Sequence, residues 1–236
     1  MTVGERIGGR RPAPLACRFD ALIFDFDGVL IESEYAGNKH IADYLTSKGH
    51  PTTPEQSMAR FMGLAGADFH AAVEHWIGRA LPDDFHEARR IEDARAVREG
   101  VDPVAGAVAF VRALPPSLPR AIASSSSTHW IERHLDHLGL RDAFGDTIFS
   151  GREHVERGKP APDLYLHAAA ALGFDIARAA IIEDSPVGAT GAVASGGYVI
   201  GFTGGSHCAP DHADRLRAAG VAAIAADFDA VARLLG

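Results

Sequence analysis

The chain has 236 residues, of which 47% are hydrophobic and 23% charged, and its formal net charge is −8. This composition is ordinary for a globular protein and argues against disorder as its main state. The acidic balance argues against nonspecific binding to nucleic acid or to an anionic membrane surface as the main activity. It leaves room for a small anionic substrate, because a bound metal ion can reverse the local field.

The amino-terminal residues and the two cysteines bear on the compartment of the protein. Residues 1–18 hold four arginines but lack the apolar core of a secretory signal, so we expect a flexible N-terminal tail there. No stretch approaches the roughly 20 apolar residues of a membrane-spanning helix. Cys17 and Cys208 cannot form a framework of several disulfides, which favours a cytoplasmic protein.

The first element that we expect is a buried strand over residues 19–26, which read FDALIFDF. Its apolar and aromatic content suits a strand of a parallel sheet that is covered on both faces. A turn signal, Asp-Gly, follows directly. Asp25 and Asp27 are two residues apart, so on an extended chain their side chains point the same way.

The pattern then turns helical as far as Gly100. Apolar residues between Phe69 and Ala80 recur at helical spacing, and a second stripe runs from Phe85 to Ala94. Residues 53–56 (TPEQ) read as a capping box with proline at the first helical position. We therefore expect a small helical bundle, a cap domain over residues 34–100, inserted after the first strand.

Strand-like runs resume after this insert at residues 120–123, 147–150, 180–183 and 198–202. Helical stretches separate them and begin near Ser126, Pro162 and Pro186. The alternation predicts an α/β fold with an open parallel sheet, whose core domain is formed by residues 19–33 and 101–236. In such sheets, ligands bind beyond the carboxyl ends of the strands.

Polar residues gather at three of these strand ends and in one loop: Asp25 and Asp27, Ser124 and Ser125, Glu183 and Asp184, and the loop residue Lys159. Because the strands of a parallel sheet end at one edge, we expect these side chains to converge. Four carboxylates in one crevice stay ionised together only beside a cation, and ligation by oxygen alone suits Mg²⁺. The alternative is a pair of solvated turn acids, which the accompanying lysine and hydroxyl disfavour.

The hydroxyl and the lysine suit a phosphate. Ser124 comes just before a predicted helix, where a hydroxyl and free backbone N–H groups bind phosphate well. N-capping by Ser126 or Thr128 is the alternative use of the hydroxyls that follow. For Lys159, which precedes a proline and is therefore not expected to be helical, the alternative is a solvent-exposed loop lysine.

Together these residues resemble the four motifs of the haloacid dehalogenase superfamily. Residues 25–30 (DFDGVL) match its first motif, Ser124 its second, Lys159 in GKPAPDLY its third, and residues 183–188 (EDSPVG) its fourth. The resemblance runs over residues ~19–205 and includes the position of the helical cap. Within the superfamily, the phosphatase and β-phosphoglucomutase-like branch is the most similar.

The resemblance implies that Asp25 attacks phosphorus to form an aspartyl-phosphate, and that Asp27 protonates the leaving alcohol and then activates water. It implies a Mg²⁺ ion held by Asp25, the main-chain carbonyl of Asp27, and Asp184. Glu183 is implied to act on the metal through water or from behind these ligands. The phosphoryl oxygens are assigned to three side chains: Ser124, Ser125 and Lys159.

The resemblance also limits the types of reaction that we expect. The dehalogenase and phosphonate-cleaving branches generally lack an acid at the position of Asp27. The mutase branch carries a cap histidine and a cap arginine, where an ungapped alignment from Asp25 places Gly37 and Gly66. We therefore expect a phosphatase of a small phosphorylated metabolite, with sugar or sugar-acid phosphates first. A sugar-phosphate mutase is the alternative, and a non-catalytic metal- or metabolite-binding module is an alternative of another class.

Because the cap is inserted directly after the first motif, we expect four parts of it to overlook the site: Glu34, Tyr35, Asn38 and the loop 62–66. Opening and closing of the cap would admit the substrate and exclude water. The oligomeric state stays open, and a monomer is compatible with the sequence.

Histidines and tryptophans outside the motifs are expected to be structural. The chain has 12 histidines, and His134 and His137 lie three residues apart, but a solvated helix face is favoured over a zinc site. For His207, after a Gly-rich loop, we expect no catalytic role. Trp76 and Trp130 fall on apolar helical stripes, and we expect them to pack in a core.

Overall fold

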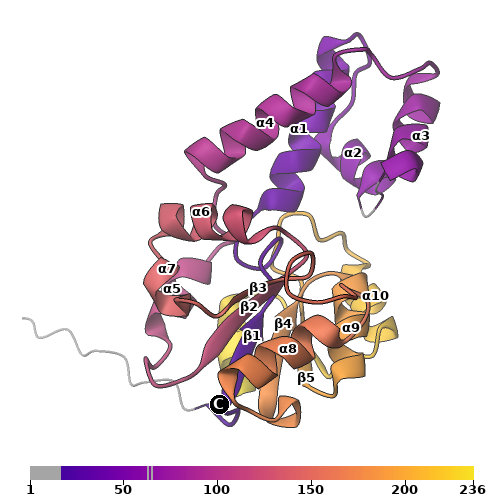
Figure 1. Ribbon diagram of the computed structural model, residues 1–236. Coiled ribbons are helices and arrows are strands. Elements are labelled where there is room, and N and C mark those ends of the chain that lie inside the picture. The colour runs from indigo at the N-terminus through magenta and orange to yellow at the C-terminus, as the bar shows by residue number, and fades with distance from the viewer. Residues whose placement is uncertain (1–16, 63, 65) are drawn as a thin grey trace, which may run out of the picture.

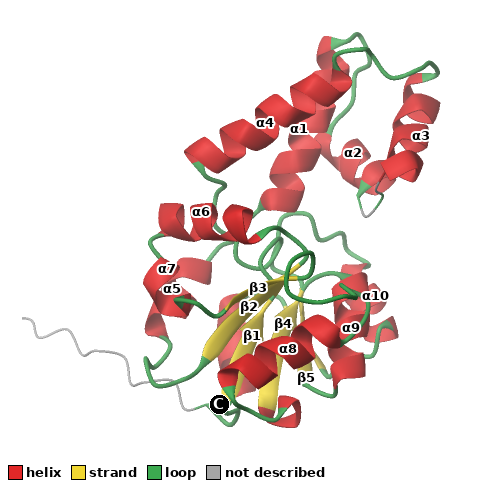
Figure 2. Cartoon of the chain, viewed as in Figure 1, coloured by secondary structure: helices red, strands yellow, loops and turns green. Residues whose placement is uncertain are grey.

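The computed structural model describes residues 17–62, 64 and 66–236, and it confirms the predicted α/β fold. Within this part of the chain, six strands form one sheet in the order β3-β2-β1-β4-β5-β6 (Figure 2). Every neighbouring pair is parallel. The strands are β1 (Ala21–Phe24), β2 (Arg120–Ser124), β3 (Ile148–Ser150), β4 (Ala179–Glu183), β5 (Tyr198–Phe202) and β6 (Ala223–Ala225).

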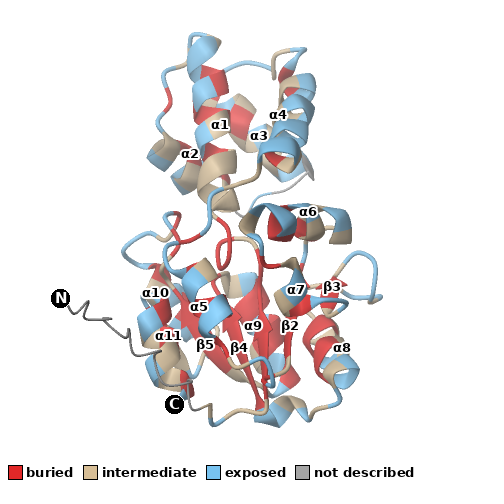
Figure 3. Cartoon of the chain, turned by 90° about the vertical axis from the view of Figure 1, so that its left-hand side faces the viewer, coloured by how far each residue is buried: buried red, intermediate tan, exposed pale blue. Residues whose placement is uncertain are grey.

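Two layers of helices cover the sheet. The helices α5 (Ala107–Ala113), α6 (Thr128–Leu138), α7 (Arg141–Phe144) and α11 (Phe228–Leu235) pack on one face, and α8 (Asp163–Leu172) and α9 (Pro186–Ser195) on the other. The strand β1 alternates between the layers: Leu22 and Phe24 join the first cluster, whereas Ala21 and Ile23 join the second. The central strands are accordingly buried throughout (Figure 3).

The first strand is shorter than predicted, because the chain turns as soon as it leaves the sheet. The amide of Asp25 still bonds to the carbonyl of Ile182, at 2.9 Å, but the amides of Leu30 and Ile31 already fold back onto the carbonyl of Phe26. This turn places Asp25 and Asp27 at the sheet edge. The helix α10 (His212–Ala218) and the short helix η1 (Ile176–Arg178) complete the core.

Four helices between β1 and β2 form the cap, which stands beyond the carboxyl ends of the strands (Figure 1). They are α1 (Ser33–Ser47), α2 (Pro54–Phe61), α3 (Gly66–Ile77) and α4 (Phe85–Glu99). They enclose their own apolar cluster, which includes Leu45, Phe61 and Phe85. The predicted capping box of α2 is confirmed, because Thr53 and Gln56 each accept a hydrogen bond from the other's amide.

The end of the predicted tail lies against the core. The amide of Arg18 donates to the carbonyl of Leu235 at 2.9 Å, and its guanidinium lies over the rings of Phe19 and Tyr198. Residues 1–16 of that tail, and residues 63 and 65 of the predicted cap loop, lie outside the described residues. Among the helices that the structure describes, none combines the length and the apolar character needed to cross a membrane.

Candidate active site

The sheet edge and the cap together enclose a cavity of about 1160 Å³. Six of the seven predicted site residues line it: Asp25, Asp27, Ser124, Ser125, Lys159 and Asp184. The seventh, Glu183, is fully buried directly beneath. The cap contributes Glu34, Tyr35, Met62 and Leu64 to the lining, as the position of the insert predicts. Asn38 is buried inside the cap instead, where its side chain bonds to the Glu34 carbonyl and to Ser57.

Lys159 joins two of the buried carboxylates. Its Nζ lies 2.7 Å from Oδ1 of Asp25 and 2.8 Å from Oε2 of Glu183, and its side chain is 5% exposed. The sequence left open a solvent-exposed loop lysine, and the structure excludes this. The cation reaches the sheet edge because its loop runs directly into α8, which packs on β1 and β2.

The carboxylate of Glu183 is fully engaged by protein donors. Its Oε2 also accepts from the Tyr165 hydroxyl at 2.6 Å, and its Oε1 accepts from the Ser185 amide and hydroxyl at 3.0 and 2.7 Å. A Cβ at Gly188 would come within 2.2 Å of this carboxyl group, so the first turn of α9 closes tightly over it. Glu183 thus holds Lys159 in place from below.

The charges of this cluster do not balance within the protein. Burial, reinforced by the charge of Glu183, raises the pKa of Asp25 well above its usual value, and the same two causes raise the pKa of Asp184. Burial would also raise the pKa of Glu183. The charge of Lys159 and the hydrogen bonds from Lys159, Tyr165 and Ser185 outweigh burial, so the pKa of Glu183 is lowered. A cation beside Asp25 and Asp184 would favour their ionised forms.

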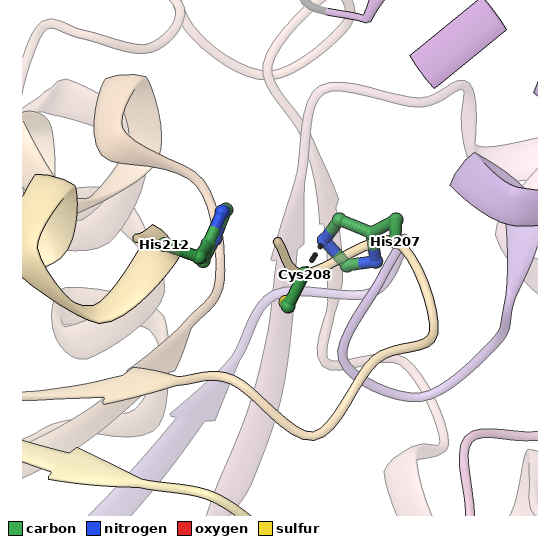
Figure 4. Close-up of side chains that lie close together, drawn as sticks. All are labelled: His207, Cys208 and His212. Carbon is green, nitrogen blue, oxygen red and sulfur yellow. Dashed lines mark hydrogen bonds between the residues drawn. The ribbon is translucent and has the colours of Figure 1, made fainter. Parts of the chain in front are cut away.

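Asp184 contains an acceptor that the protein leaves free. Its Oδ2 lies 2.8 Å from Nε2 of His207, and its carbonyl accepts from Nε2 of His212 at 2.6 Å (Figure 4 shows both rings). Its Oδ1 is buried without a hydrogen-bond partner among the described residues. Oxygens of Asp25, Glu183 and Asp184 lie within 4.8 Å of one another. A buried set of carboxylate oxygens with one acceptor unpaired fits a hard divalent cation such as Mg²⁺.

Asp27 also lines the cavity, and it accepts four hydrogen bonds from described residues. Its Oδ1 accepts from the Ser33 hydroxyl at 2.7 Å and from the Trp130 indole at 3.0 Å. Its Oδ2 accepts from the Ser126 hydroxyl at 2.6 Å and the Ser124 hydroxyl at 3.2 Å. The donors come from α1, from α6, from the last residue of β2 and from the turn after it, so this carboxylate connects the cap to the core.

The four serines from the end of β2 to the start of α6 differ in exposure and in hydrogen bonding. Ser124 is buried and accepts from the Ser126 amide at 3.0 Å, whereas Ser125 is exposed on the cavity wall. The cap of α6 is neither of the predicted alternatives, because Ser127 accepts from the Trp130 amide instead. Ser126 is thereby left free to bind Asp27.

Two aromatic residues of the site differ from the sequence-based expectation. Trp130 packs against the core only in part, because its indole nitrogen bonds to Asp27. His134 is fully buried rather than solvated, and its ring packs against Trp130 at a centroid distance of 4.1 Å, tilted by 41°. His207, for which we expect no catalytic role, lines the cavity and lies beside Asp184. Helical periodicity places Trp130 and His134 toward the core, but it cannot tell that α6 starts at the site; the loop of His207 has no periodicity at all.

A comparison with known families matches residues 19–196 to the haloacid dehalogenase-like hydrolases. The chain belongs to this family. Relatives include a 6-phosphogluconate phosphatase of Escherichia coli strain K12, 27% identical over 82% of this chain and 86% of the relative. Hexitol phosphatase A of the same strain is 30% identical over 78% and 82%. The enzyme is therefore a phosphoric monoester hydrolase of the haloacid dehalogenase type.

Solved structures agree with this assignment. A haloacid dehalogenase family hydrolase from Deinococcus radiodurans R1, solved with bound phosphate and sodium, superimposes with a TM-score of 0.82. It is 31% identical in sequence, and the match covers 93% of this chain and 99% of that one. The likeness includes both the sheet and the cap.

Proposed function

We propose that the enzyme is a Mg²⁺-dependent phosphatase that hydrolyses the phosphate ester of a sugar or sugar acid through an aspartyl-phosphate on Asp25. The observation that carries this proposal is the pairing of Lys159 with Asp25 inside a carboxylate cluster that is short of positive charge. A nucleophilic carboxylate has to be ionised, and Lys159 together with a dication would keep it so.

Each step uses a side chain at the sheet edge. An oxygen of Asp25 bonds to phosphorus, and the bond from phosphorus to the alcohol oxygen breaks. Asp27 gives its proton to that oxygen and later takes one from the water that attacks the acyl phosphate. Ser124, Ser125 and Lys159 donate to the phosphoryl oxygens while their charge develops. Inorganic phosphate leaves, and Asp25 is restored.

The metal would be held by Asp25, by Asp184 and by the carbonyl of Asp27. When bound, the ion would screen the charge between Asp25 and the approaching phosphate. Glu183 supports it from behind through Lys159, because the lysine, Tyr165 and Ser185 already occupy its oxygens.

The substrate class is supported by the cavity and by the relatives. About 1160 Å³ exceeds the space that a phosphate alone needs, so the cavity accommodates a ligand of the size of a sugar phosphate. Both acidic and basic side chains of the cap line it, including Glu34, Lys39 and Arg89. Such groups bind hydroxyls and carboxylates, and the relatives named above act on phosphates of a sugar acid and of hexitols.

Two other functions make different predictions. A sugar-phosphate mutase would return an isomerised phosphate ester, but Gly37, at the position of the mutase histidine, offers the cavity no side chain. A non-catalytic module would bind metal and metabolite without turnover, and it would have no use for the positioned pair Asp25 and Asp27.

Phosphate release from a panel of sugar, sugar-acid and hexitol phosphates tests the proposal. We expect release with Mg²⁺ and none with a chelator, with at least one of these classes preferred over aryl phosphates. Isomerised hexose phosphate without free phosphate would identify a mutase instead. Saturable ligand binding without any turnover would identify a binding module.

A further inference from the structure

We propose that His207, Cys208 and His212 form a second metal site, selective for a soft divalent cation such as Zn²⁺, whose occupancy withdraws Asp184 from catalysis. The three residues lie in the segment between β5 and α10, which reads HCAPDH (Figure 4). One ligand atom from each lies within 4.8 Å of those of the other two. The effect on turnover rests on the proposed function, whereas the metal site itself does not.

The two histidines are buried, Cys208 is half-buried, and the histidine rings are only partly satisfied. His207 and His212 are 4% and 3% exposed, and Nδ1 of each ring has no hydrogen-bond partner among the described residues. The thiol of Cys208 lies 3.5 Å from Nε2 of His207, and it forms no disulfide with any described residue. Two buried imidazoles beside a free thiol are the donors that Zn²⁺ prefers.

The site needs only a small rearrangement. Zn²⁺ bonds of about 2.0–2.3 Å bring the donor atoms of a tetrahedral site to roughly 3.3–3.7 Å apart, so the donors must approach by about 1 Å. Because all three residues come from one segment of six positions, this adjustment is local. The amide of Cys208 bonds to the Gly205 carbonyl and that of His212 to the Ala209 carbonyl, so the backbone already brings the side chains together.

Asp184 completes the site. Its Oδ2 lies 2.8 Å from Nε2 of His207. When both atoms bind one ion, this hydrogen bond is lost, and the neutral imidazole carries its proton on the unpaired Nδ1 instead. A thiolate, a carboxylate and two neutral imidazoles balance the charge of a dication, and the thiol proton passes to solvent when the ion binds. The site discriminates by chemistry, because sulfur and imidazole ligands favour Zn²⁺ over Mg²⁺, whereas the oxygens of Asp25 and Asp184 suit Mg²⁺.

The consequence for catalysis follows from the sharing of Asp184. This carboxylate would hold Mg²⁺ in the active site, and a second dication on the same side chain takes over part of its charge and repels the first ion. Zn²⁺ at His207, Cys208 and His212 therefore weakens the binding of Mg²⁺ and inhibits the phosphatase. In this way the enzyme responds to the availability of zinc.

Cobalt spectroscopy tests the site without reference to activity. Co²⁺ is titrated into the metal-free full-length protein with a non-thiol reductant. We expect a thiolate-to-cobalt charge-transfer band in the near ultraviolet, saturating at one ion per chain. The band should be lost in Cys208→Ala and Cys208→Ser, each checked for folding by circular dichroism, and kept in Cys17→Ser. Cys17 is the matched control, because it lines a shallow hollow beside Asp20 at the opposite end of the sheet.

Zinc inhibition at saturating Mg²⁺ tests the effect on turnover. We expect Cys208→Ala to raise the half-inhibitory concentration of Zn²⁺ at least about tenfold, with Cys17→Ser unchanged. Absence of the cobalt band in the wild type overturns the metal site. Equal zinc sensitivity of wild type and Cys208→Ala overturns the inhibition, because zinc would then act at the Mg²⁺ ligands. Failure of the proposed function would leave no turnover to inhibit, and the cobalt band would still decide on the site.

Discussion

Lys159 offsets part of the negative charge of the site. It is buried between Asp25 and Glu183, and those two charges raise its pKa well above its usual value although burial alone would lower it. An exposed ion pair stabilises a protein by about 1 kcal/mol or less, but removal of one partner from a buried group leaves an uncompensated charge.

We therefore predict that Lys159→Met lowers the free energy of unfolding by about 3–5 kcal/mol in the presence of a chelator. Excess Mg²⁺ should recover part of this loss, because the dication replaces the missing charge. Urea unfolding with and without Mg²⁺ measures both effects. Lys48→Met, which removes the lysine of the peripheral pair with Asp84, is the matched control, with an expected loss below about 1 kcal/mol. Equal losses in the two variants would contradict this electrostatic role.

Gly28 is a residue that the site requires for two reasons. Its φ is +79°, and an added Cβ would come within 2.2 Å of Oδ2 of Asp184 and 2.8 Å of the His207 ring. Gly173, at the end of α8, has nearly the same φ of +78°, but a Cβ there meets nothing within 4 Å. An alanine at either position would strain the backbone, but only an alanine at Gly28 would also displace Asp184. Comparing the two variants therefore separates the two effects.

We predict that both alanine variants lose about 1–2 kcal/mol of stability from the left-handed backbone. Gly28→Ala should in addition weaken Mg²⁺-dependent turnover by at least about tenfold, because Asp184 has to move. Gly173→Ala should keep the turnover of the wild type. Unfolding curves and the Mg²⁺ dependence of kcat/KM measure these effects. An unchanged Mg²⁺ requirement in Gly28→Ala would argue against Asp184 as a metal ligand.

At the scale of the elements, the periodic helices of the cap and five apolar strands could be predicted, whereas several short elements were missed. The stripes from Phe69 to Ala80 and from Phe85 to Ala94 became α3 and α4, and α4 ends at Gly100 as expected. The helices α5 and α10 have seven residues each, and β6 has three, too few to show a period. Their positions depend on packing against the sheet.

The predicted site residues could be placed from the topology of the sheet. Strand ends of a parallel sheet meet at one edge, so Asp25, Ser124 and Glu183 could be placed together from sequence alone. The contacts of Trp130 and His207 depend on how α6 and the loop after β5 sit on that edge. No local pattern encodes this tertiary arrangement.

The helix α6 also carries a pH-dependent part of stability. Burial lowers the pKa of His134 below its usual 6.5, and its Nδ1 donates to the Trp130 carbonyl. In the unfolded chain, His134 takes up a proton near pH 6.5, whereas in the folded protein it is protonated only at a lower pH. This contribution to stability is therefore complete above that pH and is lost as the pH falls toward the lowered folded-state value.

We predict that the wild type loses more stability than His134→Leu between about pH 7.5 and pH 5.5, by up to about 1.4 kcal/mol per pH unit. Comparing the two proteins cancels the other titrating groups of the site. Unfolding by urea at each pH measures the difference. Parallel pH profiles of the two proteins would show that His134 is not held neutral in the fold.

At the scale of the whole molecule, the cap and the core share one cavity and several polar contacts. Ser33 of α1 bonds to Asp27, and Glu32 accepts from the amide and hydroxyl of Ser206 in the loop after β5. The connection from the first motif into the cap is thus held at the site itself. If the cap moves, the movement would reach Asp27 through Ser33. In the proposed mechanism this contact would couple closure over the substrate to the position of the general acid.

The account as a whole depends on Asp25 as the nucleophile of a Mg²⁺-dependent phosphatase. Asp25→Asn preserves the shape of the side chain and an acceptor for Lys159 but removes the charged oxygen that attacks phosphorus. The most direct measurement is Mg²⁺-dependent phosphate release by this variant on the best substrate of the panel, with its fold verified by circular dichroism. We predict a loss of at least about a thousandfold relative to the wild type. Phosphate release by the folded variant at a rate close to that of the wild type would contradict the account.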